Sequence, residues 1–531
     1  MGMILNPSNE KFAEVLNSEI YIDKSMFIVR TNKVINTLQK YVCVSRPRRF
    51  GKSVTADMLC AYYGQEDSAS LFAGLKIAQV EGAQKYQNQF HVIHWNVLDY
   101  FSESGNHTNE MIALLLEDTM SELESEFPDA LKHVRRNLSR MLSAIYAKTG
   151  RKFVFVIDEW DCIFRRNKED IASQTEYLDF LRNLLKDKVY VALAYMTGIL
   201  PVKKYGEHSA LNMFTEISVA DAGQYAEFTG FTETEVKVLC DQYSMEYDEV
   251  NRWYDGYRIN DISVYNPKSV VEAMLRRKIG NYWTQTETYE ALKIYIQTNM
   301  DGLHEKVEQL IAGEKIEVDI TSFQNDMTTF CSADDVLALL IHLGYLTYYE
   351  SGTDNRISVC WIPNLEVQQE FIRCIKSTEG WEHVMHAIRQ SDQLLEDTIK
   401  GDEKAVGEAL RQLHYENTSL LTYSNENSLS CLINLAYYSA RKYYTVLREL
   451  ETGEGFADVV FIPYKNTCKP AMIVELKYNQ NADTAIDQIK EKRYHGALSQ
   501  YLDRLLIVGI NYDKKTKEHS CKIERFQSDG M

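Results

Sequence analysis

One short segment near the N-terminus restricts the possible folds of this chain more than any other feature. The apolar run Tyr41–Ser45 reads as a buried strand, Arg46–Phe50 follows as a loop, and Gly51-Lys52-Ser53 opens a helical pattern. This is the context of a phosphate-binding loop. Because the first amides of a helix attract anions, the sequence predicts that Lys52 reaches the β- and γ-phosphates and that the Ser53 hydroxyl ligates Mg²⁺.

The loop departs from the usual pattern at its first position, where Arg46 replaces glycine. We therefore expect a loop that bends differently or binds nucleotide less tightly than usual. The other interpretation is that Gly-Lys-Ser stands at a helix start by chance. If the loop binds phosphate, Arg46, Arg49 and Gly51 join Lys52 and Ser53 as the residues expected to bind ATP.

A second apolar run, Phe153–Ile157, ends directly in the two acids Asp158 and Glu159. With the upstream loop, this pattern predicts that Asp158 holds Mg²⁺ and that Glu159 polarises the water that attacks the nucleotide. The alternative is a buried strand that ends in acidic loop residues. The next predicted strand ends at Met196, so we expect Thr197 to lie beside Asp158 as a candidate sensor of the γ-phosphate. The alternative is an ordinary threonine at the end of a strand.

The first 220 residues alternate short apolar runs with longer helical patterns, one of which stops at Gly150, as helices often do. Such alternation predicts an α/β fold, a mostly parallel sheet with helices on both faces. The predicted strands are Tyr41–Ser45, His91–Val97, Phe153–Ile157 and Val189–Met196, and the helix before Gly150 spans Leu131–Lys148.

Residues 221–401 read mainly as helix, with one exception. Asp334–Leu343 has a helical pattern, and Tyr345–Glu350 and Arg356–Ile362 read as two strands around the turn Ser351–Asn355. A helix followed by a β-hairpin resembles a winged-helix unit. Such units often contact DNA, but within larger assemblies they are often purely structural, and fold alone does not establish function.

The C-terminal segment contains a pattern that brings two carboxylates together. Phe456–Pro463 and Ala471–Tyr478 read as two strands of a hairpin. A symmetric hairpin places Asp458 opposite Glu475, with Cβ atoms about 5 Å apart. Since side chains alternate along a strand, Glu475 and Lys477 share a face.

Two facing carboxylates destabilise a hairpin unless a positive charge neutralises them, and Mg²⁺ with its oxygen ligands is the natural choice. We therefore predict that Asp458 and Glu475 bind a metal ion. Lys477 would orient or deprotonate a metal-bound water for attack on a phosphodiester. The alternative is a surface Glu–Lys pair with an incidental Asp, although these residues lie inside apolar strands.

The order of elements from Asn425 to Asn511 resembles the PD-(D/E)xK nuclease superfamily, whose core runs helix, three strands, helix, strand. Asp458 and Glu475-Leu-Lys477 fit its short signature. The predicted helices are Leu429–Ala440 and Ala482–Gln500, and the predicted strands are Tyr443–Leu450, Phe456–Pro463, Ala471–Tyr478 and Arg504–Asn511.

This resemblance implies two further site residues. One is an acid on the first helix that would also bind the metal, for which Glu426 is the candidate and Glu449 and Glu451 are rivals. The other is Gln488, which would lie near the metal on the helix that follows the hairpin. The alternative for Gln488 is a solvated helix face.

The two halves together resemble one prokaryotic family whose members join a predicted AAA-type ATPase-like domain to a C-terminal PD-(D/E)xK domain. Arg46 looks like this family's own variant of the loop. The resemblance implies an ATPase domain over residues 1–220, a helical region over 221–401 and a nuclease-like domain over 402–531. Its motifs are Tyr21-Ile-Asp-Lys-Ser25, Arg46–Ser53, Asp158-Glu-Trp-Asp161, Leu211-Asn-Met-Phe214, Tyr265-Asn-Pro267, Gly455–Asp458 and Val474–Lys477.

Three hypotheses follow. The first is an ATPase, with ATP and Mg²⁺ as cofactors, that carries a Mg²⁺-dependent nuclease domain acting on DNA or RNA. The second is a nucleotide-regulated interaction protein whose nuclease fold binds nucleic acid or a partner without cutting. The third is an ATPase with no role on nucleic acid. A homo-oligomer is compatible with the first, with Arg165 and Arg166 as candidate arginine fingers.

Charge and composition narrow these hypotheses. The 58 Lys and Arg residues against 76 Asp and Glu give a net charge of −18, which disfavours general nucleic-acid binding. Residues 441–531 carry +2, so a nucleic-acid contact is expected there.

No apolar run approaches the ~18 residues of a membrane span, and the N-terminus does not resemble a secretory signal. Ten scattered cysteines without zinc spacing favour reduced thiols in a cytoplasmic protein.

Overall fold

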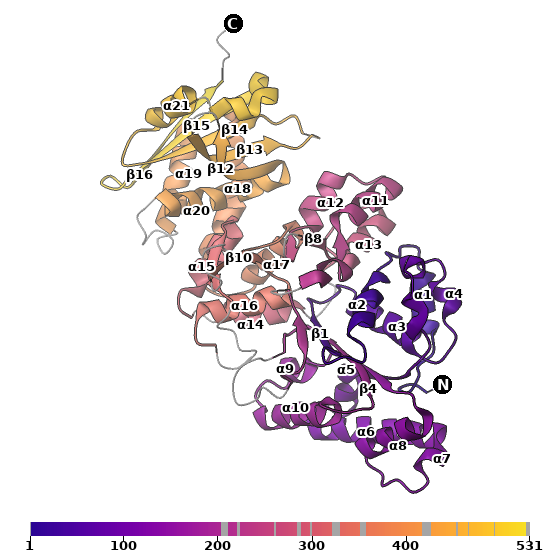
Figure 1. The fold of residues 1–531 in the computed structure, drawn as a ribbon. Helices are drawn as coiled ribbons and strands as arrows, with labels where there is room; N and C mark the ends of the chain where they lie inside the picture. Colours follow the sequence, from indigo (N-terminus) through magenta and orange to yellow (C-terminus); the bar gives the residue numbers. More distant parts are fainter. Residues whose placement is uncertain are drawn as a thin grey trace. The chain divides into compact units, whose positions relative to one another are not determined.

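The computed structural model describes residues 2–202, 211–219, 223–259, 262–283, 288–297, 300–320, 330–350, 357–416, 426–452, 455–465, 467–492 and 494–526. The chain divides into two compact units (Figure 1). Unit 1 comprises Met1–Thr286 and Glu317–Val367, and unit 2 comprises Glu287–Ile316 and Gln368–Met531.

Unit 1 contains a five-stranded parallel sheet in the order β2-β3-β4-β1-β5. All residues of β1, β3 and β4 are buried, as the continuous apolar runs require when helices cover both faces. The predicted strands are confirmed with small shifts at their ends, and β5 was not predicted. The strands are β1 (Tyr41–Ser45), β2 (His91–Asn96), β3 (Phe153–Asp158), β4 (Val191–Gly198) and β5 (Thr215–Ile217).

The helix predicted over Leu131–Lys148 is divided in two, because the Asn137 side chain accepts a hydrogen bond from the Arg140 amide and starts a new helix. That helix ends at Gly150, which has φ +68° as predicted for a C-terminal glycine. The helices around this sheet are α1 (Glu10–Leu16), α2 (Met26–Val34), α3 (Lys52–Tyr63), α4 (Ala69–Phe72), α5 (Val97–Glu103), α6 (Thr108–Glu126), α7 (Pro128–Leu131), α8 (Leu138–Thr149), α9 (Cys162–Arg166) and α10 (Ile171–Leu185), with short 3₁₀ turns at Lys76–Gln79 and Ala83–Tyr86.

The rest of unit 1 is mainly helical but also contains two three-stranded sheets, in the orders β6-β8-β7 and β10-β11-β9. The predicted helix and hairpin are confirmed as α16 and the antiparallel pair β10–β11, and the turn Ser351–Asn355 lies outside the described residues. The elements are η3 (Gly223–Phe228), β6 (Phe231–Thr232), α11 (Glu233–Tyr243), α12 (Tyr247–Tyr254), β7 (Tyr257–Ile259), β8 (Ile262–Tyr265), α13 (Pro267–Arg276), β9 (Ile316–Asp319), α16 (Ala333–Leu343), β10 (Thr347–Glu350) and β11 (Ile357–Trp361).

Unit 2 is built on a five-stranded sheet in the order β12-β13-β14-β15-β16, in which only β14 and β15 pair in parallel. The predicted helix Ala482–Gln500 ends at Glu491 and is followed by a 3₁₀ segment, and β16 was not predicted. The strands are β12 (Tyr444–Thr452), β13 (Gly455–Pro463), β14 (Ala471–Tyr478), β15 (Leu505–Asp513) and β16 (Glu518–Arg525). The helices are α14 (Thr288–Gln297), α15 (Leu303–Ala312), α17 (Leu365–Lys376), α18 (Glu382–Lys400), α19 (Glu403–Glu416), α20 (Glu426–Ala436), η4 (Tyr438–Lys442), α21 (Ala482–Glu491) and η5 (Tyr494–Arg504).

Alternate residues of the central strand β14 enter two separate cores. Met472 and Val474 pack with α18, α19 and α20, whereas Ala471 and Ile473 pack with α21. These helices are labelled around the sheet in Figure 1. Glu475 therefore belongs, by alternation, to the α21 face of the sheet. Across the residues that the structure describes, no helix is both long and apolar enough to cross a bilayer.

Candidate functional sites

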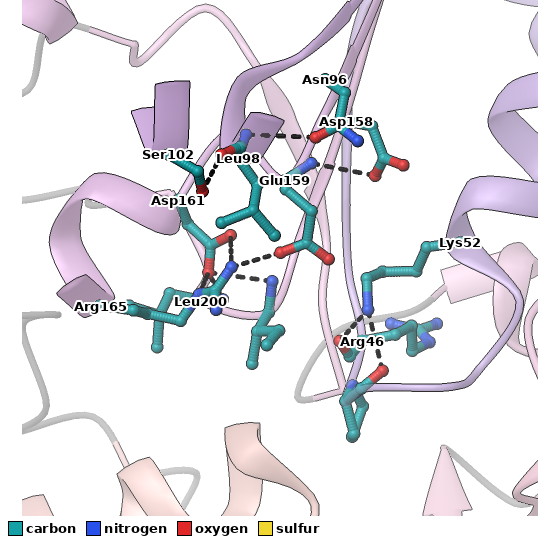
Figure 2. Close-up of polar contacts among 12 residues, drawn as sticks. Arg46, Lys52, Asn96, Leu98, Ser102, Asp158, Glu159, Asp161, Arg165 and Leu200 are labelled. Atoms are coloured by element: carbon teal, nitrogen blue, oxygen red, sulfur yellow. Dashed lines mark hydrogen bonds and ion pairs between the residues drawn. The ribbon is translucent and has the colours of Figure 1, made fainter. Parts of the chain in front are cut away.

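The loop before α3 closes around the Lys52 side chain. Gly51 precedes the helix with φ +84°, a left-handed conformation that favours glycine. The Lys52 ammonium donates to the carbonyls of Arg46 and Pro47, each at 3.0 Å (Figure 2). Burial lowers the pKa of Lys52, and the carboxylates of Glu159 and Asp158 oppose this shift. The ammonium therefore lies between the loop backbone and the acids at the end of β3.

Two of the three arginines of the loop, Arg46 and Arg49, are engaged by protein groups. Arg46 is fully buried, and it donates to Thr229 Oγ1 at 2.8 Å and to the Ile217 carbonyl at 2.9 Å. Arg49 has φ +70° and donates to the Tyr282 carbonyl at 2.6 Å. In this structure both side chains brace the loop against its surroundings. Their predicted contact with ATP remains a prediction.

Asp158 ends β3 and is only 4% exposed. The strand register places it beside Thr197 of β4, as predicted, and beside Asn96 of β2. Burial raises the pKa of Asp158, whereas a hydrogen bond from Ser53 and the charge of Lys52 lower it. Ser53 and Asp158, the two residues predicted to hold Mg²⁺ in unit 1, thus lie in contact.

Glu159, the predicted activator of water, is held by a residue of the same chain. Its backbone has φ +52°, and its amide donates to Asp158 Oδ1 at 2.9 Å. The Arg165 guanidinium contacts Glu159 Oε2 and also donates to Asp161 Oδ2 at 3.0 Å (Figure 2). Asp161 is fully buried. The sequence had suggested Arg165 only as an arginine finger.

Two residues near this site were missed by the sequence reasoning. Asp57 lies one turn after Ser53 in α3, and burial together with the charge of Asp158 raises its pKa to about 6, while Lys11 opposes the shift. The i, i+4 spacing from Ser53 was the signal that could have identified it. Asn96 could have been identified as the last polar residue of its strand, the position that aligns with Asp158.

The second site forms on the hairpin of β13 and β14. The pairs Val459–Val474, Val460–Ile473 and Phe461–Met472 follow the predicted register, and Asp458 and Glu475 are the next residues beyond the last of these pairs. Asp458 Oδ2 accepts a hydrogen bond from the Leu476 amide at 2.6 Å. The predicted register is therefore confirmed over the three pairs that lead up to the two acids.

Glu475 is the centre of this second site. It is 2% exposed, and its Oε1 accepts a hydrogen bond from the Lys477 ammonium at 2.9 Å and contacts the Gln488 amide nitrogen of α21. Its other oxygen, Oε2, is buried and has no hydrogen-bond partner within the described part of the chain. Burial, together with the charge of Asp458, raises the pKa of Glu475 to about 7, against the effect of Lys477.

The additional acid implied by the nuclease resemblance is not assigned by the structure. Glu426 begins α20, and its side chain lies outside the described residues. Glu449 is exposed with φ +46°, and the β12–β13 register places it across from Asp458; Glu451 is exposed as well. No three His, Cys, Asp or Glu side chains among those described converge on a metal position, so the site offers two carboxylates.

An N-terminal segment and a C-terminal segment of the chain each match a known protein family. Residues 9–206 match the model of a family described as predicted AAA-ATPase, and residues 424–521 match that of the PD-(D/E)XK nuclease superfamily. An uncharacterised protein from the vnfD 5′ region of Azotobacter chroococcum mcd 1 is 27% identical over 371 residues, which cover 68% of this chain and 67% of that protein.

Two solved structures show distant similarity to the chain. The ORC2 protein of Aeropyrum pernix, in ADPNP and ADP complexes, aligns with a TM-score of 0.30 and 11% identity over 68% of this chain and 97% of that one. Drosophila ORC bound to DNA aligns with a TM-score of 0.25 and 12% identity over 69% and 91%. From the family matches, the chain carries a predicted AAA-ATPase domain in residues 9–206 and a PD-(D/E)XK nuclease superfamily domain in residues 424–521.

Proposed function

We propose that this protein binds and hydrolyses ATP at the Lys52 loop and cuts nucleic-acid phosphodiesters at the Asp458–Glu475 site, with Mg²⁺ at both sites. The observation that carries the nuclease proposal is the Oε2 atom of Glu475. Among the described residues it is a buried carboxylate oxygen without a hydrogen-bond partner, and the charge of Asp458 acts on the same carboxyl group. Such an atom is costly unless a cation or another donor engages it.

The residues present fit a hard cation. Asp458 and Glu475 would hold Mg²⁺, which commonly relies on one or two protein carboxylates and keeps several waters. The ion would supply a Lewis acid for the scissile phosphate and a water of lowered pKa. Lys477 and Gln488 both fix Oε1 of Glu475, so they set the orientation of that carboxylate. Lys477 is also the side chain that would orient the attacking water.

The first site supports ATP hydrolysis on the same grounds of geometry. Lys52 contacts loop carbonyls, and its ammonium would bind the β- and γ-phosphates when nucleotide enters. Ser53 and Asp158 would hold Mg²⁺, and Glu159 would polarise the attacking water. The parallel order of the sheet brings these residues together, because Asp158 ends one strand and the loop follows another.

A cleavage assay tests the nuclease proposal. Purified protein is incubated with single- and double-stranded DNA and RNA, with Mg²⁺ or Mn²⁺, and with or without ATP. Asp458→Ala should abolish cleavage and the metal-induced rise in melting temperature. Lys477→Ala should keep the melting shift but cut roughly 10²–10⁴ times more slowly. Lys490→Ala removes an exposed lysine of α21 and should behave as wild type.

Calorimetry and phosphate release test the ATPase proposal. Lys52→Ala should abolish ATP binding, whereas Glu159→Gln should bind ATP and lose hydrolysis. Lys237→Ala, which removes an exposed lysine of α11, is the control. Equal ATP affinity of the wild type and Lys52→Ala would refute nucleotide binding at this loop.

A second function is favoured by the charge of the chain. Residues 1–440 carry −20, which opposes nucleic acid over most of the molecule. A protein that binds a partner or nucleic acid without cutting, under control of nucleotide, agrees with this charge. If the wild type cuts no nucleic acid with ATP present and shows no melting shift with Mg²⁺ or Mn²⁺, this second function replaces the nuclease proposal.

A further inference from the structure

We propose that Arg165 is a positioning residue for Glu159 within its own chain, and that it is not an arginine finger for a neighbouring copy. The inference rests on the proposed ATPase function and assigns a role that neither the loop motif nor the acidic motif specifies. It starts from one observation: the side chain predicted to polarise water is bound by a guanidinium six residues later.

Arg165 is held by two carboxylates at once. From α9 its Nε donates to Asp161 Oδ2 at 3.0 Å and its Nη2 lies 3.3 Å from Asp161 Oδ1, while the same Nη2 contacts Glu159 Oε2 (Figure 2). The Arg165 side chain is 8% exposed. A guanidinium presents its donors in a fixed planar fork, so the binding of Asp161 sets where its remaining donor points.

Asp161 is in turn fixed by the backbone of the neighbouring strand. Its Oδ2 accepts hydrogen bonds from the amides of Ile199 at 3.0 Å and Leu200 at 2.8 Å, directly after β4. Gly198 leaves room for this arrangement, because a Cβ at that position would lie 2.6 Å from Asp161 Oδ1. A continuous set of contacts therefore runs from the end of β4 through Asp161 and Arg165 to the Glu159 carboxylate.

This arrangement argues against a role in trans. An arginine finger must present its guanidinium to the phosphate of a nucleotide bound elsewhere. Arg165 could do so only by leaving Asp161, which is fully buried and would then lose its counter-charge and keep only the two backbone amides as partners. Glu159, by contrast, is a partly exposed side chain that needs an external contact to hold one orientation. The geometry therefore places the function of Arg165 in the orientation of Glu159.

Steady-state kinetics of Arg165 variants separate positioning from binding. Arg165→Ala and Arg165→Lys should lower kcat for ATP by roughly 10–10², the usual effect of a misplaced catalytic group, with KM within about twofold. Because lysine retains a positive charge for Asp161, Arg165→Lys should fold as the wild type does. Because lysine cannot bind two carboxylates as a planar fork, its kcat should recover only in part relative to Arg165→Ala. Arg182→Ala, an exposed arginine of α10, is the control.

Mixing of variants separates action in cis from action in trans. If Arg165 acts in its own chain, an equimolar mixture of Arg165→Lys and Glu159→Gln should show no more hydrolysis than the two proteins measured separately. If Arg165 were a finger, Glu159→Gln subunits would supply it to Arg165→Lys subunits, and the mixture would gain activity. Such a gain would overturn the inference.

Thermal melting without nucleotide provides a readout that does not depend on hydrolysis. If Arg165 and Glu159 contact each other, Arg165→Lys should lower the melting temperature less in the Glu159→Gln background than in the wild type. Equal shifts in both backgrounds, or a wild-type kcat for Arg165→Lys, would overturn this inference alone. A wild type that does not hydrolyse ATP would overturn the proposed ATPase function as well, so the two failures are distinguishable.

Discussion

Glu475 is a buried residue whose preferred protonation state is expected to depend on whether a cation is bound. Two donors engage Oε1, and within the described residues Oε2 has no partner. Burial and the charge of Asp458 both favour the protonated acid, whereas a bound cation would favour the carboxylate. The stability of metal-free protein should therefore depend on pH through this residue.

The pH dependence has a definite sign. The pKa of Glu475 rises from 4.5 to about 7 in the folded protein, with burial as the main cause. Between these values the folded protein keeps a proton that the unfolded chain has released, so stability falls as pH rises through this window. The contribution is roughly 3 kcal/mol at most. Urea unfolding in EDTA at pH 5 and pH 8 should therefore show a smaller loss for Glu475→Gln than for the wild type.

The control for this comparison is Glu518→Gln, an exposed glutamate at the start of β16, which should keep the wild-type pH profile. Mg²⁺ adds an independent check. Because Mg²⁺ favours the ionised carboxylate, its stabilisation of the wild type should be larger at pH 8 than at pH 6 and should be absent in Glu475→Gln. Parallel pH profiles of the wild type and Glu475→Gln would contradict the raised pKa.

At the scale of residues, the sequence predicted the positions that strand ends and alternation determine. Parallel register places Asp158 beside Thr197. Hairpin symmetry predicts Asp458 opposite Glu475. The roles of Asp161 and Arg165 could not be predicted, because their contacts depend on a short helix whose direction no periodicity specifies. The burial of Arg46 depends on acceptors almost two hundred residues away, such as Thr229.

At the scale of elements, the loop Arg46–Phe50 packs against parts of unit 1 that come much later in the chain. The Phe50 carbonyl accepts a hydrogen bond from the Gly230 amide at 3.1 Å, and the Phe50 ring meets the Tyr257 ring edge-on, with centroids 5.1 Å apart. Gly344, directly after α16, lies against Pro47. This packing explains why the residues between Arg46 and Gly51 differ from the small residues that are usual in a phosphate loop.

Gly344→Ala tests whether this packing supports nucleotide binding. Gly344 has φ +86°, and a Cβ there would lie 2.7 Å from the Pro47 Cβ, so the loop must shift. We expect a loss of about 1–3 kcal/mol in stability and a weaker affinity for ATP, because the Pro47 carbonyl also binds Lys52. Urea unfolding and calorimetry measure the two effects.

Gly150→Ala is the matched control. Gly150 also has a left-handed backbone, with φ +68°, but a Cβ there would meet nothing within 4 Å. It should therefore lose about 1 kcal/mol through backbone strain alone and bind ATP as the wild type does. If Gly344→Ala binds ATP with unchanged affinity, the packing on Pro47 is structural only.

The two strands that the sequence missed in the five-stranded sheets, β5 and β16, are both edge strands. The strand β16 reads as polar because it is an edge strand, where only one neighbour, β15, supplies hydrogen bonds and many side chains face solvent. The helix predicted to reach Gln500 ends at Glu491, although its composition permits continuation. By contrast, α16 and its hairpin were predicted almost to the residue, because their apolar periodicity changes clearly from one element to the next.

At the scale of the whole molecule, the chain passes between its two compact units three times. Residues 287–316 belong to unit 2, 317–367 return to unit 1, and the remainder belongs to unit 2. The division predicted from sequence at residue 402 therefore separates the nuclease-like segment from helices of its own unit. Composition could not indicate this, because α15 and α18 have the same amphipathic patterns as the helices around them.

Truncation tests how much the C-terminal domain depends on those helices. Leu394 and Leu395 of α18 pack in the same hydrophobic core as Val459 and Val474, which belong to the two strands that carry the candidate site. Each buried leucine contributes on the order of 2–5 kcal/mol, so the loss of both approaches the total stability of a domain. A fragment of residues 402–531 should therefore unfold without a cooperative transition.

A fragment of residues 382–531 restores α18 and should melt cooperatively when followed by circular dichroism. It should remain less stable than unit 2 of the intact chain, because Arg448 of β12 loses its ion pair with Glu314 and Arg441 loses the Ala312 carbonyl. In the full chain, Leu394→Ala should lower stability by about 2–5 kcal/mol, whereas the exposed neighbour Gln393→Ala should change it by less than about 0.5 kcal/mol. Equal cooperative melting of both fragments would mean that the sheet and α19–α21 suffice for folding, and that α18 serves the rest of unit 2 instead.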